Sequence, residues 1–264
     1  MTDERLKRFR SAYAEHRAAE GRGSGGAAEV MALPYLRTGP HARGWRVRAC
    51  TFDRFVESVM KPAVRAAGRP LRVLDAGAGN GWLCNRIAGM GHEAVALDVR
   101  TDDVDGLGAA RGCESAFARV AAAFEALPVR DGTFDMVVFN AALHYAQSLD
   151  AVLAEAVRAV AAGGRIVVLD SPFYTHEADG DAMVAQKRAH ATTQFGDRAG
   201  DLLALPFIEF LTHERLADAS APLGLEWRRH RVRYPLWYEA RPLVARVRRR
   251  RAPSRFDVWE ASVR

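Results

Sequence analysis

Residues 73–82 read VLDAGAGNGW, and this stretch decides the fold class. An apolar run ends in an acid, and the glycines at positions 77, 79 and 81 then alternate with small residues. Absent side chains in such a turn let a ligand lie against backbone N–H groups and the positive end of the helix that follows. The stretch therefore predicts a strand, a bare turn that binds a ligand, and a helix.

Strands and helices alternate on both sides of this turn. Short apolar runs predict buried strands at 71–76, 93–99, 134–140 and 165–170. Helices are expected at 82–90, 103–111 and 149–160, whereas 117–124 suits a strand or a helix equally well. Alternation of this kind implies right-handed crossovers and an α/β fold with a doubly wound, parallel sheet. Ligands of such sheets bind at the carboxyl ends of the strands.

Two further features narrow the identity of the ligand. A dinucleotide-binding turn would carry its third glycine at position 82, where this chain has Trp82, and no Gly-Lys-Ser/Thr follows the turn as a phosphate-binding loop requires. Asp98 ends the next strand, 21 residues beyond Gly77. An acid at this point accepts hydrogen bonds from both ribose hydroxyls of an adenosine. The pattern therefore argues against NAD and FAD, but a ligand that contains an adenosine group is still expected.

Several ordered motifs together resemble a known family. VLDAGAGNG, ALDV, FEALPVRDGTFDMVVFNAALHY and the strand after GGR are similar to the class I S-adenosylmethionine-dependent methyltransferases of the type 11 group. The resemblance is strong over 71–170 and looser toward both ends. It implies a Rossmann-like, seven-stranded, mostly parallel sheet with an antiparallel last strand, an N-terminal helical lid and a helical insert after strand five. It also implies an enzyme with S-adenosyl-L-methionine as cofactor and S-adenosyl-L-homocysteine as product.

The resemblance assigns cofactor-binding roles residue by residue. The turn is expected to face the methionine portion, Asp98 the ribose and Val99 the adenine. The family usually offers an acid to the adenine amino group where this chain has Ala123, so Phe124 is expected to bind adenine through its ring and backbone N–H. Arg48 is expected to pair with the methionine carboxylate, with an ordinary surface charge as the alternative. The full expected set is Arg48, Asp75, Gly77, Ala78, Gly79, Asn80, Gly81, Asp98, Val99, Ala123, Phe124, Asn140 and Ala141.

Few catalytic groups are expected, because a sulfonium already makes its methyl carbon electrophilic and transfer mainly requires alignment and a dry site. A general base is needed only where the acceptor must lose a proton. His144 and Tyr145 are the catalytic candidates, although a histidine at this point can equally hold a loop or pack on the cofactor. Residues expected to bind the substrate are Tyr13, His144, Tyr174 and His176.

The chain is expected to divide into a helical cap or lid at 1–67 and a methyltransferase core at 68–264. The cap holds a helix at 3–20, a glycine-rich hinge at 21–29 and a helix at 51–67. A substrate-site insert at about 171–215 includes the segments 183–195 and 202–211, both expected to be helical. Apolar residues of the second segment suit a pocket or a dimer face. After it we expect a half-exposed strand at 225–237, an arginine-rich turn, and an antiparallel edge strand at 255–263.

Composition limits the partners. The net charge is +6, but only three of the 38 basic residues are lysine, which indicates a coding bias, and no aromatic-interleaved patch accompanies the arginine run 246–251. Nucleic acid is therefore not expected, and a small-molecule substrate is. No apolar stretch reaches the ~18 residues of a membrane span, and the first residues lack a signal segment, so we expect a cytoplasmic protein. The three cysteines, Cys50, Cys84 and Cys113, form no metal-binding or redox pattern. A homodimer stays open.

Three functions remain possible from the sequence. The leading prediction is methyl transfer to a small-molecule acceptor in secondary metabolism. An RNA or protein methyltransferase is the alternative enzyme, and it predicts salt-sensitive RNA binding. A cofactor-binding scaffold or regulatory subunit without turnover is the alternative of another class.

Overall fold

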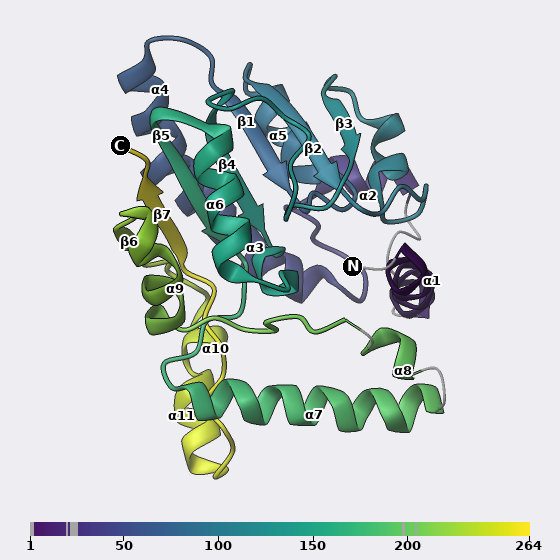
Figure 1. The fold of residues 1–264 in the computed structure, drawn as a ribbon. Helices are drawn as coiled ribbons and strands as arrows, with labels where there is room; N and C mark the ends of the chain where they lie inside the picture. Colours follow the sequence, from purple (N-terminus) through teal and green to yellow (C-terminus); the bar gives the residue numbers. More distant parts are fainter. Residues whose placement is uncertain (1–2, 20, 22–25, 197–198, 204) are drawn as a thin grey trace.

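The computed structural model describes residues 3–19, 21, 26–196, 199–203 and 205–264, and a seven-stranded sheet lies at its centre (Figure 1). The strand order is β3-β2-β1-β4-β5-β7-β6. Strands β1 to β5 pair in parallel, and β7 pairs antiparallel with both β5 and β6. The bounds are β1 Arg72–Ala76, β2 Glu93–Asp98, β3 Ala118–Ala121, β4 Phe134–Asn140, β5 Val160–Leu169, β6 Trp227–His230 and β7 Val258–Ser262. The predicted mostly parallel sheet with an antiparallel last strand is confirmed.

Helices cover both faces of the sheet. Those on one face pack around Trp82, Phe55 and the inward side chains of β1, and those on the other pack around Leu153 and Phe139. Figure 1 shows α1, α7 and α8 beyond the carboxyl ends of the parallel strands. The first face carries α2 Gly26–Ala32, α3 Ala42–Phe55, η1 Val56–Met60, α4 Lys61–Ala67 and α5 Trp82–Gly89, and the second carries α6 Leu149–Ala159 and α9 His213–Ser220. The remaining helices are α1 Asp3–Ala19, η2 Leu107–Gly112, η3 Leu143–Tyr145, α7 Glu177–Phe195, α8 Ala199–Leu202, η5 Ala221–Leu223, α10 Leu236–Glu239 and α11 Arg241–Val247.

Local sequence signals account for the central elements. Strands β1, β4 and β5 are short apolar runs buried on both faces, as parallel strands covered by helices are. Helix α6 begins where the Ser148 hydroxyl accepts a hydrogen bond from the backbone N–H of Ala151 at 3.2 Å, which satisfies one of the free donors of the first turn. These elements hold the carboxyl ends of β1, β2, β4 and β5 in one row.

The helix predicted at 202–211 is wrong beyond its first residue. Only α8 is helical in this part of the insert, and residues 206–210 form neither helix nor strand, because proline removes a helical donor and disfavours helix before it. The loop after β4 pairs with this irregular backbone, since Ile208 N donates to Ala146 O and Glu209 N donates to His144 O, each at 2.9 Å. The neighbouring helix α7 is present as predicted and begins at Glu177.

Three predictions in the C-terminal portion are also wrong. The strand predicted at 225–237 is only the four residues of β6, because the Asp257 carboxylate takes the backbone N–H of Val232 at 2.8 Å and draws the chain out of the ladder. The arginine run is not a simple turn, since helices α10 and α11 fill the connection and Arg246 lies within α11. The predicted edge strand at 255–263 lies between β5 and β6 as β7, so β6 is the edge.

The N-terminal predictions fall partly outside the described residues. Positions 22–25 of the expected hinge belong to that undescribed part. The helix predicted at 51–67 begins earlier, at Ala42, and continues through η1 into α4. The ambiguous segment 117–124 contains β3. Within the described ranges, no helix is long and apolar enough to cross a bilayer.

Candidate active site

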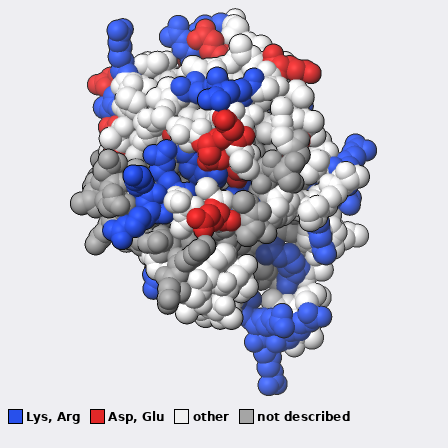
Figure 2. Space-filling view, turned by 90° about the vertical axis from the view of Figure 1, so that its right-hand side faces the viewer, with Lys and Arg blue, Asp and Glu red and all other residues white. Residues whose placement is uncertain are grey.

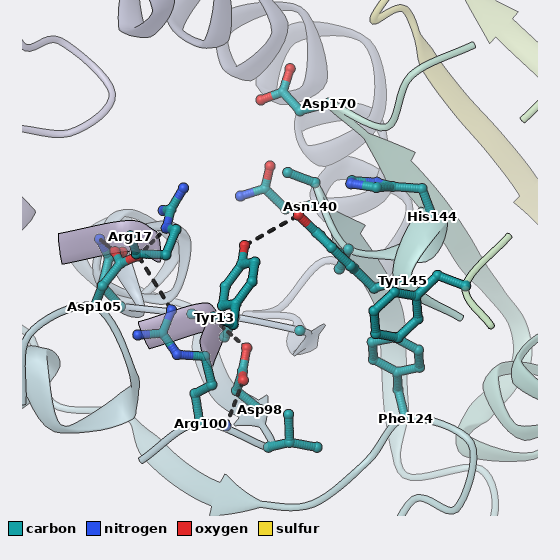
Figure 3. A pocket seen from close by; sticks show the side chains of 18 of the residues that line it. Tyr13, Arg17, Asp98, Arg100, Asp105, Phe124, Asn140, His144, Tyr145 and Asp170 are labelled. Atoms are coloured by element: carbon teal, nitrogen blue, oxygen red, sulfur yellow. Dashed lines mark hydrogen bonds and ion pairs between the residues drawn. The ribbon is translucent and has the colours of Figure 1, made fainter. Parts of the chain in front are cut away.

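A cavity of about 360 Å³ lies at the carboxyl ends of β1, β2, β4 and β5 (Figure 3). Helix α1, helix α3 and the extended segment after α8 close over it. Most of the residues that the sequence predicts for the site line this one cavity. They are Tyr13, Arg48, Gly77, Ala78, Gly79, Asn80, Asp98, Val99, Ala123, Phe124, Asn140, Ala141, His144 and Tyr145.

The glycine turn forms the floor of the cavity and is tied to the end of β2. The backbone N–H groups of Gly77 and Ala78 both donate to Leu97 O, at 2.7 and 3.0 Å. Gly77 has φ +84°, and a Cβ on it would meet Ala142 Cβ at 2.4 Å and the Phe124 ring at 3.5 Å. Only glycine satisfies both conditions, so the backbone at this point stays bare and open to a ligand.

Asp98 faces this turn from the end of β2. Its Oδ2 accepts from Gly79 N at 2.8 Å and its Oδ1 accepts from Arg100 N at 2.7 Å. Burial raises the pKa of Asp98, and these two N–H donors oppose the rise. An ionised carboxylate offers about four acceptor positions, so about two remain for the hydroxyls of a ligand.

Helix α1 contributes Tyr13 and Arg17 to the wall of the cavity. The Tyr13 hydroxyl lies 3.2 Å from the Tyr145 hydroxyl, and Arg17 Nε donates to Asp105 Oδ2 at 2.6 Å. The Arg100 guanidinium lies 5.2 Å from the centre of the Tyr13 ring. Arg17, Arg100 and Asp105 are site residues that the sequence reading missed, because each depends on contacts between segments far apart in the chain.

His144 lies at the other end of the cavity, in the short helix η3. Its Nδ1 is 3.3 Å from the Ser171 hydroxyl, and its ring packs against Tyr145 with centroids 4.3 Å apart. Burial lowers the pKa of His144 and the nearby cations Lys187 and Arg48 add to this effect, so that the pKa is about 3. The imidazole is therefore neutral at physiological pH.

Asp170 is a second acid of the cavity that the sequence reading missed. It directly follows β5, is 7% exposed and has φ +49°. Burial raises the pKa of Asp170 to about 6, while Arg48 and the Thr51 hydroxyl oppose the rise. Its Oδ1 is buried without a hydrogen-bond partner among the described residues. The available signal was an acid at the end of a strand, the same signal that singled out Asp98.

Asp75 and Gly81 lie beneath the turn and do not line the cavity. Asp75 is fully buried, and Cys84 Sγ donates to its Oδ2 at 3.9 Å. Burial raises the pKa of Asp75, and the charge of Asp98 raises it further, which favours the neutral acid. A Cβ on Gly81 would meet the Phe117 ring at 3.0 Å, so this glycine allows α5 to pack against its neighbours.

Tyr174 and His176 also lie away from the cavity wall. The Tyr174 hydroxyl accepts from Arg251 Nη1 at 2.9 Å, and its ring meets Phe210 edge to face at 5.7 Å. His176 is the residue that precedes the first turn of α7. Phe207, one of the apolar residues of the insert, does line the cavity and meets the Tyr145 ring edge to face at 5.4 Å.

Comparison with known proteins agrees with this geometry. Residues 74–168 match the family model described as a methyltransferase domain. Two curated relatives are named malonyl-[acyl-carrier protein] O-methyltransferase. That of Erwinia pyrifoliae is 37% identical over 100 residues (38% of this chain, 37% of the relative), and that of Erwinia billingiae is 31% identical over 111 residues (42% of each). The chain thus spans less than half the length of these relatives.

Solved structures share the fold. A Bacillus halodurans protein described as a candidate methyltransferase has a TM-score of 0.52 at 18% identity, covering 78% of this chain and 98% of its own. A geranyl diphosphate methyltransferase solved with its substrate and sinefungin has a TM-score of 0.51 at 16% identity, covering 73% and 71%. Residues 74–168 therefore form a methyltransferase domain, so the predicted methyltransferase family is confirmed at the level of this domain, and the solved structures confirm its fold.

Proposed function

We propose that the chain transfers a methyl group from S-adenosyl-L-methionine to a small-molecule acceptor. The observation that carries the proposal is the pairing of Asp98 with the bare turn at the floor of the cavity. The carboxylate keeps room for ribose hydroxyls after its two backbone contacts, and Gly77 leaves no side chain above the turn. The residues present thus fit an adenosine ligand with a methionine tail.

Neighbouring groups support one orientation of that ligand. Phe124 stands edge to face with Phe139 at 6.0 Å and presents its ring to the cavity beside Ala123 and Glu125, which suits the adenine. Arg48 also lines the cavity, where it can pair with the methionine carboxylate. We therefore expect the reactive centre between the turn and Asn140, which line the same cavity.

Bound there, the sulfonium supplies an electrophilic methyl carbon. The protein's part is to align the acceptor with that carbon and to exclude water. Helix α1 supports exclusion through Tyr13 and Arg17, which bridge the cavity to Tyr145 and Asp105. Apolar walls from Trp45, Pro172 and Phe207 support a small, largely apolar acceptor over an extended polymer.

Calorimetric titration tests the cofactor. We expect S-adenosylmethionine and S-adenosylhomocysteine to bind at micromolar concentrations and NAD not to bind. Asp98→Ala should weaken both sulfur ligands about tenfold or more, since a hydrogen bond to a charged group contributes about 1.5 to 3 kcal/mol. Glu226→Gln, which removes an exposed carboxylate of the surface, is the matched control. Unchanged affinity in Asp98→Ala would contradict the ribose assignment, and no binding of either sulfur ligand by the wild type would contradict the proposed function.

The remaining sequence predictions concern partners and location. We propose weak homodimerisation through α10 and α11, because Leu236, Leu243 and Val247 are 88%, 66% and 75% exposed on that surface. That the acceptor belongs to secondary metabolism and that the protein is cytoplasmic both stay predictions. The division of the chain into a cap and a core at residue 67 also stays a prediction. In the structure, α3 and α4 of the predicted cap pack against the sheet as part of the main core.

A further inference from the structure

The end of the cavity away from Asp98 holds two buried oxygen acceptors without partners among the described residues. These are Asp170 Oδ1 and Asn140 Oδ1. Figure 3 shows both side chains on the same side of the cavity, with Asn140 between Asp170 and the cofactor-binding residues. A buried acceptor without a donor costs about 1 to 3 kcal/mol, so its presence in a cavity indicates a ligand that brings O–H or N–H groups.

The surroundings of Asp170 keep it charged at neutral pH without satisfying it. Arg48 and the Thr51 hydroxyl, both on α3, lower its pKa, whereas burial raises it. Thr51 itself is held by Tyr234, with hydroxyl oxygens 3.0 Å apart, and Tyr234 donates to Phe256 O at 2.5 Å. Tyr234 and Tyr238 face the carboxylate as neutral phenols, because burial raises the pKa of each. Asp170 is therefore an acid with a pKa of about 6 that lines the cavity.

His144 is less suited to accept a proton in this environment. Its neutral ring titrates far below physiological pH, so a proton placed on it at neutral pH is held weakly. The carboxylate of Asp170 titrates near pH 6, close to the value at which a general base works best.

We propose that Asp170 binds the methyl acceptor and takes its proton, so that the acceptor is a neutral compound with a hydroxyl or amine on an apolar ring. This inference rests on the proposed methyl transfer. The O–H or N–H bond of the acceptor breaks and its proton goes to Asp170 Oδ1. The electron pair left on that oxygen or nitrogen forms the bond to the methyl carbon, and the carbon–sulfur bond breaks with its pair staying on sulfur. Atoms and charge balance without another reactant.

The same geometry disfavours an acceptor that is itself a carboxylate. Such an acceptor needs no base and would place a second negative charge beside Asp170, whose own charge already interacts with Arg48, and this costs free energy. The curated relatives are named for O-methylation of a malonyl group, which carries a carboxylate. This chain is therefore expected to differ from them in acceptor class, and Pro172 and Phe256 supply the apolar contact for a ring near Asp170.

A matched pair of probes tests the inference. Binding of 2-naphthol and 2-naphthoate is measured by fluorescence on full-length protein saturated with S-adenosylhomocysteine. We expect the wild type to bind 2-naphthol about tenfold tighter than 2-naphthoate. Asp170→Asn should erase this preference while the affinity for S-adenosylhomocysteine stays unchanged. Asparagine tolerates the left-handed backbone, so the variant is expected to fold, and Asp218→Asn on the surface is the control.

A pH series on the wild type gives an independent readout. The preference for 2-naphthol should fall as the pH drops through about 6, because Asp170 becomes protonated, and His144 stays neutral throughout that range. Tighter binding of 2-naphthoate, failure of 2-naphthol to bind, or a preference that survives in Asp170→Asn would each overturn the inference. Failure of S-adenosylhomocysteine to bind would instead overturn the proposed function.

Discussion

At the residue scale, the bare turn is the feature on which the site depends most. Gly77→Ala and Gly91→Ala place the same methyl group at nearly the same backbone angle, φ +84° and +86°. Both are expected to lose about 1 to 2 kcal/mol of stability to backbone strain. Gly77→Ala adds a 2.4 Å clash with Ala142, worth about 1 to 3 kcal/mol more, and blocks the cofactor. Urea unfolding and calorimetry with S-adenosylhomocysteine check this, and equal behaviour of the two variants would refute it.

His144 gives a prediction for acid stability. The folded pKa of about 3 lies below the ordinary 6.5, so the unfolded chain takes up a proton that the folded chain does not. Stability is therefore lost as pH falls from 6.5 toward 3, by up to about 1.4 kcal/mol per pH unit. Asp170 opposes this, since its raised pKa stabilises the fold as pH falls through about 6. His144→Gln should gain stability relative to the wild type on acidification, measured by urea unfolding at several pH values; a constant difference would contradict the buried neutral ring.

At the element scale, only a few contacts hold α1 over the cavity. Arg17 is expected to slow release of the cofactor, because its ion pair with Asp105 at 2.6 Å fastens α1 next to the glycine turn. Arg17→Ala should speed the dissociation of S-adenosylhomocysteine several-fold, as a partly buried ion pair of about 1 kcal/mol would predict, with little change in Tm. Stopped-flow displacement measures the rate. Arg8→Ala, on the exposed side of the same helix, is the control, and equal rates in the two variants would argue against a lid.

Some elements could be predicted from the sequence and others could not. The sheet core was predictable because VLDAGAGNGW, an acid after the next strand and buried apolar runs each depend on local pattern. The irregular course of the chain after Pro206 was not predictable, because its backbone pairs with the distant loop at His144 and Ala146. Asp170 could not be predicted for a similar reason. Its proposed role depends on its unpartnered oxygen and on the nearby Arg48 and Thr51. The sequence shows only an acid at the end of a strand.

At the scale of the whole molecule, the surface around α11 combines attraction and repulsion. Leu243 and Val247 are exposed there, and arginines 246 and 248–250 surround them. Figure 2 shows Lys and Arg side chains gathered at the lowest point of the molecule, where Figure 1 places α11. Two copies that meet through this surface bury apolar area but bring like charges together. The net charge of +6 adds to the repulsion at longer range.

Salt separates these forces. Screening weakens the repulsion between arginines and leaves apolar burial intact, so sedimentation should show self-association that increases with ionic strength. Leu243→Ser with Val247→Ser should abolish the increase, whereas Val104→Ser, at an exposed apolar residue elsewhere, should not. RNA held by the same arginines would behave in the opposite way, because phosphate binding weakens steeply as salt rises. Self-association that falls with salt would therefore remove the apolar surface as its cause and reopen the nucleic-acid alternative.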